Sequence, residues 1–260
     1  MLIFNCTKAA ADFFTSTRKG NKISPMSPTP KTGLNEETIL HDHQRWHWMV
    51  HVTKFGHKNV LLTMDTDSRF CMAFWGLRKG NFQNFFEQFH ERFRFHIAAV
   101  INMGGQDETT LETSMQTFIE NHHQYTFVQR GDRSVQAHIN DAFMHLQYEQ
   151  HQWNEWDPTE EELFISDFRN NDTPRKRKQD KDYLFPTQEL FQTWLSRYAS
   201  LDEQTIEHTI SQYHQMNRQL WRFPFDIDID DLNFDENDSE IAEALSDNVL
   251  LFKDYTKQKD

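Results

Sequence analysis

A chain of 260 residues with 37% hydrophobic and 14% aromatic residues can bury a sizeable core, which excludes a chain that is disordered along most of its length. No stretch reaches the roughly 18 consecutive apolar residues of a membrane span. Two cysteines, Cys6 and Cys71, cannot build a disulfide framework, so we expect reduced core thiols in a soluble, cytoplasmic protein.

Charge is unevenly distributed along the chain, whose formal net charge is -13. Residues 1–158 carry 15 Lys and Arg against 17 Asp and Glu, whereas residues 159–260 carry 12 against 23. Because an acidic surface repels phosphate backbones, this imbalance argues against general nucleic-acid binding by the second part and favours a basic protein partner.

The N-terminal segment predicts a strand followed by a helix. LIFNC at 2–6 is an apolar run of strand length, and Thr7 provides a hydroxyl cap in front of KAAADFF. The run lacks the basic start and long apolar centre of a secretory signal, so we expect it to belong to the fold. From 16 to 34 the composition shifts to Ser, Thr, Pro, Lys and Gly, which predicts an exposed loop.

An antiparallel meander of three strands follows. Apolar and polar residues alternate over 45–55, and 60–64 is an almost continuous apolar run. The apolar pattern resumes at 69–75 after the turn at 65–68, whose Asp and Ser residues favour a tight connection. We expect the centre of this meander to be buried on both faces.

Helices dominate the rest of the chain. Asn81 can cap a long helix in which Phe residues recur at three- and four-residue spacing, a pattern typical of a helix face buried in the core. Gly104 and Gly105 end it. Further helices are predicted at 110–121, 134–150, 187–199, 202–222 and 239–246, with a strand at 125–128.

These elements predict an α+β fold with a mixed or antiparallel sheet covered by helices. We assign the core domain to residues 1–158 and a polar, basic linker around the RKRK run to 159–182. Residues 183–260 are predicted to form a smaller, mostly helical, acidic extension.

Two groups of polar residues are candidates for ligand or anion binding. Asp65 and Asp67 lie in the turn of the meander, where Asp is also favoured for local hydrogen bonds alone. The second group lies at the strand-to-helix junction 130–134, where an Asp or Ser can cap the helix and arginines beside exposed amides can bind an anion. Helix capping is sufficient to explain these residues without a bound anion, so it is the favoured interpretation. The members of the second group are Arg130, Asp132, Arg133 and Ser134.

Histidines and carboxylates raise the question of a metal site. His47 and His51 share a face if 45–55 is a strand, but a metal needs three or four convergent donors and no third is fixed by spacing. We therefore expect no metal and no cofactor, with these two imidazoles as the weak candidates.

An acidic stretch near the C-terminus resembles the opening of a calcium loop. The sixth position is Asp231 and not Gly, and the twelfth is Asn237 and not Glu, so the pattern fails as an EF-hand. We expect the stretch to bind a basic partner instead. The candidate residues are Asp226, Asp228, Asp230, Asp231, Asp235 and Glu236.

Several segments together resemble an uncharacterised bacterial family known only as a domain of unknown function. They are MLIFNCTK, WHWMVHV, NVLLTMDTDSRFCMAFWGLRKGNF and DRSVQAHINDAF, the last containing Arg133-Ser134-Val135 and Asn140-Asp141. The resemblance covers about residues 1–150 and implies a fold but no activity, cofactor or catalytic residue. The segment 16–34 and the acidic part after 158 depart from the family's shorter pattern.

Three functional hypotheses remain. The first is a non-enzymatic interaction or regulatory protein whose acidic C-terminal part binds a basic partner. The second is an enzyme or small-ligand-binding domain with a pocket near the turns of the meander. The third is nucleic-acid binding through the N-terminal half and the RKRK run. No Ser-nucleophile, P-loop or dinucleotide-binding motif occurs, which favours the first over an enzyme.

Overall fold

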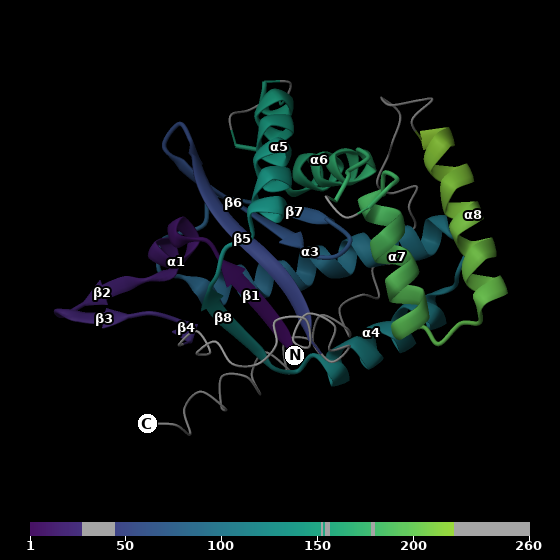
Figure 1. The fold of residues 1–260 in the computed structure, drawn as a ribbon, viewed down its shortest axis with the longest axis horizontal. Helices are drawn as coiled ribbons and strands as arrows, with labels where there is room; N and C mark the ends of the chain where they lie inside the picture. The colour runs from purple at the N-terminus through teal and green to yellow at the C-terminus, as the bar shows by residue number, and fades with distance from the viewer. Residues whose placement is uncertain (28–44, 152, 154–156, 178–179, 221–260) are drawn as a thin grey trace. The chain divides into compact units, whose positions relative to one another are not determined.

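The computed structural model describes residues 1–27, 45–151, 153, 157–177 and 180–220 (Figure 1). The chain divides into two units, Met1–Tyr213 and His214–Asp260, and the fold below is that of the first. Its strands are β1 (Leu2–Cys6), β2 (Ser16–Arg18), β3 (Asn21–Ile23), β4 (Met26–Ser27), β5 (Trp46–Phe55), β6 (Lys58–Asp65), β7 (Cys71–Trp75) and β8 (Tyr125–Gln129). Its helices are α1 (Lys8–Phe14), α3 (Phe82–Met103), α4 (Glu108–Asn121), α5 (Arg133–Gln150), α6 (Glu160–Asp172), α7 (Pro186–Arg197) and α8 (Glu203–Leu220), which continues into the second unit.

Six strands form one mixed sheet in the order β4-β8-β1-β5-β6-β7. β1 pairs in parallel with β5 and with β8, whereas β5, β6 and β7 form the antiparallel meander that the sequence predicts. A second, two-stranded sheet consists of β2 and β3. The predicted α+β class with a mixed sheet is therefore confirmed.

Side-chain caps place the starts of helices where the sequence predicts them. Oγ1 of Thr7 accepts a hydrogen bond from the amide of Ala10 at 3.3 Å, and Oδ1 of Asn81 accepts one from Asn84 at 3.2 Å. Each cap satisfies an amide that has no partner within its helix, a contribution of about 1 kcal/mol.

α3 lies across one face of the sheet (Figure 1), and its aromatic rings pack against those of the strands. The ring of Phe4, in β1, lies 5.5 Å from Phe85 and 5.0 Å from Phe89 between centroids, edge to face in both cases. Trp48 in β5 lies 4.9 Å from Phe89 in the same geometry. Such pairs contribute about 0.5–1.5 kcal/mol beyond their buried area, so the Phe face of α3 is core, as its spacing predicts.

α5 and α6 cover the meander on the other face of the sheet (Figure 1). Val135 and Ile139 of α5 and Leu163 of α6 belong to one buried cluster with Met49 of β5 and Leu62 of β6. Helices on both faces explain why β6 and β7 are buried along most of their length.

The predicted exposed loop at 16–34 is wrong for its first part, because residues 16–27 contain β2, β3 and β4. Lys19 and Gly20 adopt positive φ of 49° and 81°, which permits the two-residue turn between β2 and β3. The segment is exposed or half-buried, as expected, and residues 28–34 lie outside the described part of the chain.

The predicted linker at 159–182 is also wrong for its first half, where α6 forms. Thr159 and Glu162 make a reciprocal capping box at its start, with the Glu162 amide 3.1 Å from Thr159 Oγ1 and the Thr159 amide 2.8 Å from Glu162 Oε2. The polar composition suggested a linker, but Asp167 and Asn171 of α6 are buried and bonded to the sheet.

The side chains of α6 pair with the edge strand β7 as a neighbouring strand would. Asn171 accepts from the Cys71 amide and donates to the Cys71 carbonyl, both at 2.7 Å. Asp167 Oδ1 accepts from the Ala73 amide at 2.8 Å. These bonds satisfy edge groups that would otherwise need water or another strand.

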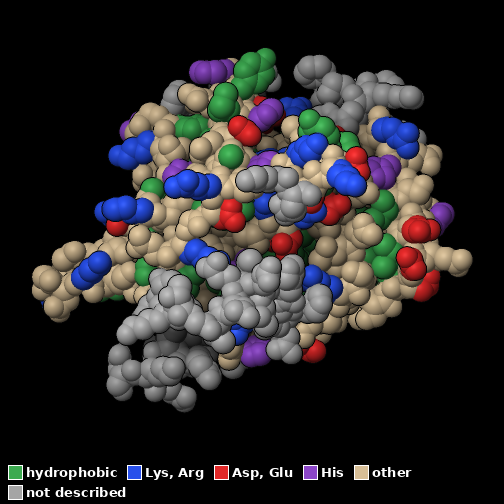
Figure 2. Space-filling view, in the orientation of Figure 1, with side chains coloured by type: hydrophobic (Ala, Val, Ile, Leu, Met, Phe, Trp, Pro, Cys, Tyr) green, Lys and Arg blue, Asp and Glu red, His purple; other side chains and the backbone are tan. Residues whose placement is uncertain are grey.

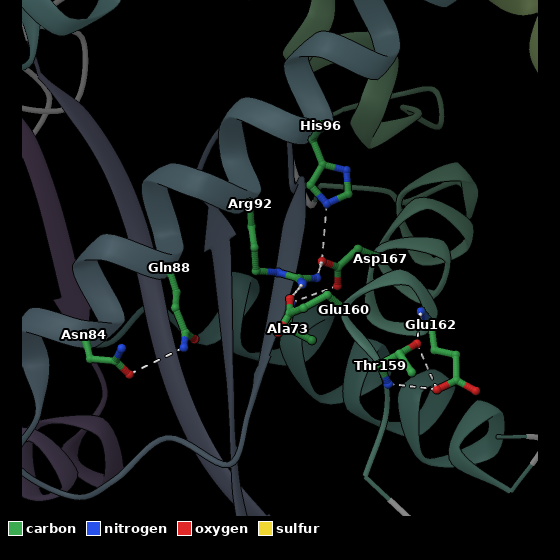
Figure 3. A network of polar contacts seen from close by, with 9 residues as sticks. All are labelled: Ala73, Asn84, Gln88, Arg92, His96, Thr159, Glu160, Glu162 and Asp167. Atoms are coloured by element: carbon green, nitrogen blue, oxygen red, sulfur yellow. Dashed lines mark hydrogen bonds and ion pairs between the residues drawn. The ribbon is translucent and has the colours of Figure 1, made fainter. Parts of the chain in front are cut away.

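Asp167 is also the centre of a buried ionic network between α6 and α3 (Figure 3). Its Oδ2 accepts from Arg92 at 2.5 Å and lies 3.3 Å from Nε2 of His96, while Arg92 also pairs with the exposed Glu160 at 2.9 Å. Asp167, Arg92 and His96 are all less than one-tenth exposed. The network fixes α6 to both the sheet and α3.

Both cysteines lie in the core as unpaired thiols. Burial raises the pKa of Cys71 to about 12 and that of Cys6 above its usual range, so neither is a reactive thiolate at neutral pH. Within the described residues, no helix is both long enough and apolar enough to span a membrane.

Candidate functional site

Three loop segments meet beside the first turn of α5. They are the β6–β7 turn at 66–70, the β8–α5 junction at 130–132 and the segment 173–177 that follows α6. The charge of Arg69, in the first segment, interacts with Asp132 in the second and Arg177 in the third. The structure thus brings together the two groups of candidates, Asp65 with Asp67 and the junction 130–134, that lie far apart in sequence.

Asp65 is a structural residue of this turn and is not accessible to a ligand. It is 2% exposed and accepts hydrogen bonds from Trp46 Nε1 at 2.8 Å and from the amide and hydroxyl of Ser68 at 2.7 and 2.6 Å. Burial, and then the charge of Asp67, raise the pKa of Asp65, while the bonds from Ser68 and Trp46 oppose this shift. Asp67 itself is exposed, and its carbonyl accepts from Arg177 at 2.8 Å.

Arg69 is one of two buried arginines of the site, together with Arg175. It is 4% exposed, has a left-handed φ of 65° and donates to the carbonyl of Thr66. Among the described residues, its Nε has no hydrogen-bond partner. Burial lowers the pKa of Arg69, and the charges of Asp132, Asp65 and Asp67 act in the opposite direction.

The junction before α5 is a helix cap, as predicted from Asp132. Its Oδ1 accepts from the amide of Ser134 at 2.8 Å and from that of Val135 at 3.1 Å. Arg130 continues the sheet, because its amide donates to the carbonyl of Cys6 at 3.0 Å. Arg133 is exposed at the first position of the helix.

An open groove of about 430 Å³ runs along the side of α5. Arg133, Gln136 and Asn140 line it with guanidinium and carboxamide groups, and Met49 and Ala137 supply its apolar walls. The remaining lining residues are Gly131 and Asp132. Four of its seven lining residues are polar or charged, so the groove can offer hydrogen bonds and charge to a ligand.

Asn5 of β1 and His47 of β5 contact each other in the sheet, and neither is a lining residue of the groove. Asn5 is the register partner of Met49, so the two side chains project from the same face of adjacent strands. Asn5 is 6% exposed, and its Nδ2 lies 3.3 Å from Nδ1 of His47 and 3.4 Å from the carbonyl of Trp48. Its Oδ1 is buried and has no partner among the described residues.

Positive charge gathers around the start of α5. Figure 2 shows Lys and Arg side chains, with a few acidic ones among them, across the middle of the face that carries α5. Two arginines of the RKRK run contribute: Arg175 is buried and donates to the carbonyl of His138 at 3.0 Å, and Arg177 donates to Asp67. Burial, and then the charges of Arg175 and Arg69, lower the pKa of His138.

The two histidines considered as metal ligands contact different partners. His47 is buried beside Asn5, whereas Nδ1 of His51 lies 2.9 Å from Oγ1 of Thr7 and burial lowers the pKa of His51. In the described part of the chain, no three His, Cys, Asp or Glu side chains are arranged to hold a metal ion. The six acidic candidates from Asp226 to Glu236 lie outside the described residues.

Four polar residues on which the site depends were not predicted from the sequence as site residues. Asn5 carries a usable signal, because a carboxamide in the middle of an apolar strand must be buried and therefore needs a partner. Arg69, Gln136 and Asn140 carry none, since nothing local shows that the turn and the helix meet.

Comparison with known proteins gives a family but no function. The sequence profile described as Domain of unknown function (DUF6933) matches residues 3–189. The resemblance to a domain of unknown function is thus confirmed, and the match extends beyond residue 150 through α6 into α7. No curated protein and no solved structure matches the chain.

Proposed function

Because the chain belongs to the family of domains of unknown function DUF6933, whose description carries no activity, we propose from the site alone that the protein binds a small anionic or polar ligand in the groove beside α5. This is the second of the three hypotheses drawn from the sequence. That hypothesis expects a pocket near the turns of the meander, whereas the lining residue that the groove takes from the meander is Met49, within β5.

The observation that carries the proposal is the buried, unsatisfied Oδ1 of Asn5, whose register partner Met49 lines the groove. A buried polar group without a partner costs about 1–3 kcal/mol of stability. The described residues offer Asn5 only two long contacts, both to its Nδ2, so a donor on a ligand would complete its hydrogen bonding. Each buried group of this kind in a folded protein needs an explanation, and a ligand donor is the one proposed for Asn5.

The chemistry of the groove supports a ligand with an apolar body and an anionic or hydrogen-bonding edge. Met49 and Ala137 can contact apolar atoms, and Gln136 and Asn140 can each donate and accept. Arg133 at the open side adds a positive charge that can bind a carboxylate or phosphate bidentately.

We expect a ligand from a panel of nucleotides, sugar phosphates and carboxylic acids to raise the melting temperature of the full chain. A concentration of 100 times Kd stabilises by about 2.7 kcal/mol, a shift of about 5–10 °C for a domain of this size. Arg133→Ala and Asn140→Ala should abolish most of this shift. Gln147→Ala, exposed on the same helix outside the groove, should leave it unchanged.

Asn5→Leu separates a ligand-binding role from a structural one. Since the carboxamide is poorly satisfied without ligand, the apolar side chain should keep or raise the melting temperature of the free protein while removing the ligand-induced shift. A variant that is destabilised without ligand and still binds would contradict the proposal.

The uneven charge favours a second candidate function, a cytoplasmic interaction protein whose acidic C-terminal segment binds a basic partner. Residues 223–252 contain no Lys or Arg, and they include all six acidic candidates. Changing Asp226, Asp228, Asp230 and Asp231 to Asn should abolish capture of a basic host protein at 50 mM salt. Changing Glu203 and Glu207, exposed on α8, to Gln should not. Capture that resists both high salt and the Asn changes would reject this candidate.

A further inference from the structure

The hairpin of β2 and β3 projects from the body of the first unit (Figure 1, left). We call residues Ser16–Ile23 the arm. Every residue from Thr17 to Ile23 is exposed, and a Cβ built on Gly20 at its tip would meet no atom within 4 Å. The arm therefore presents both strands to solvent, in a sheet of only two strands.

The arm carries positive charge and no negative charge. Arg18, Lys19 and Lys22 lie within five positions, and residues 16–27 contain no Asp or Glu. In the described part of the chain, the side chains of these three residues form no ion pair, although the charge of Lys22 interacts with the exposed carboxylate of Asp12 in α1. Arg78 and Lys79 are exposed just before Gly80, which packs against Ser16 at the base of the arm.

The other basic cluster of the chain is used internally. In the RKRK run, Arg175 bonds to His138 and Asn170, and Arg177 bonds to Asp67 and Asp180. Half of that cluster therefore stabilises the fold. In contrast to Arg175 and Arg177, all three basic residues of the arm are exposed.

The base of the arm is fixed to the body. Oγ1 of Thr15 donates to Ser24 at 3.0 Å, and the Gly80 amide donates to the Phe13 carbonyl at 2.9 Å. β4 follows the arm directly and joins the main sheet through β8. A hairpin held at its base keeps a set direction and loses little conformational entropy on binding.

We propose that the arm binds double-stranded nucleic acid by entering a groove of the duplex. A two-stranded ribbon fits the major groove of B-form DNA, and its Arg and Lys side chains can reach the phosphates on either side. Ile23, 44% exposed on the arm, supplies an apolar contact to base edges or sugars. Residues 1–158 are near neutral overall, and Asp12 opposes part of the positive charge at Lys22, although the whole chain is acidic.

The test is fluorescence anisotropy of a labelled 20-base-pair DNA duplex with the full chain. Three phosphate contacts predict that log K falls with log salt with a slope of about -2.7, so binding weakens about 40-fold between 50 and 200 mM NaCl. Changing Arg18, Lys19 and Lys22 together to Ala should weaken binding at 50 mM at least about 10-fold and flatten the slope towards zero. Ile23→Ser should weaken binding while leaving the slope unchanged.

A matched variant controls for net charge. Changing Lys54, Lys176 and Lys181 to Ala removes the same charge from exposed positions outside the arm and should leave affinity within about twofold. No binding at 50 mM, or an equal loss in the two triple variants, would overturn the proposal. So would poly-glutamate competing as well as unlabelled duplex, since the arm would then bind acidic proteins.

Discussion

Asp167→Ala is expected to lower the free energy of unfolding by about 3–5 kcal/mol, measured by urea denaturation at neutral pH. The change leaves Arg92, whose side chain is 9% exposed, without its buried carboxylate partner. It also leaves the amide of Ala73 in the edge strand unpaired. A buried charge left with only the exposed carboxylate of Glu160, together with a lost backbone partner, is among the more destabilising results of one substitution.

Two further variants separate the charge from the packing. Glu160 pairs with the same Arg92 but its side chain is 83% exposed, so Glu160→Ala should cost less than about 1 kcal/mol. Asp167→Leu combined with Arg92→Met removes both charges and should recover part of the loss. If Glu160→Ala were as damaging as Asp167→Ala, the buried geometry would not be the source of the stability.

Acidification from pH 6.5 to pH 4 is expected to destabilise the protein by up to about 3 kcal/mol through His90 alone. Burial against aromatic rings lowers the pKa of His90 to about 4, and its Nε2 has no partner among the described residues. In the unfolded chain the imidazole binds a proton below about 6.5, whereas the folded protein holds it neutral down to about 4. The unfolded state therefore binds more protons in this window, and stability falls as pH falls.

His90→Phe should remove this contribution, because the ring centroid of His90 lies 4.5 Å from Phe86 in an aromatic environment that accepts another phenyl group. Urea denaturation at pH 4.5 and 7 should show a smaller difference for the variant. Burial, and then the N-terminal charge, lower the pKa of His122 to about 3. His122 therefore contributes a residual pH dependence of stability with the same sign. An unchanged pH dependence in His90→Phe would contradict the assignment.

Local sequence patterns predicted the helices and strands whose signals lie within a single segment. The meander follows from alternation and turn residues, and α3 follows from the Phe spacing after Asn81, because both signals lie within one segment. α6 was missed since its buried face is polar: Asp167 and Asn171 satisfy the backbone of β7, a relation that only the folded sheet creates. The order of strands, with β1 between β5 and β8, depends on pairing across the chain and left no local pattern.

The site was predictable to a similar degree. Asp132 and Arg133 were found because a helix cap has a sequence signature. Asp65 was found as a polar turn residue, but its burial under three donors could not be read from the turn itself. Arg69 beside Asp132 depends on where two loops meet in space, so it appears only in the structure.

The bonds between α6 and the edge strand β7 can form only after the ribosome has synthesised α6. Asp167 follows Ala73 by 94 residues, so at about 5–20 residues per second the ribosome completes β7 roughly 5–20 s before the side chains that cover it exist. During that interval the strand can pair with another polypeptide. The exposure ends only with the synthesis of α6, which makes this helix the step at which the newly made sheet is protected from aggregation.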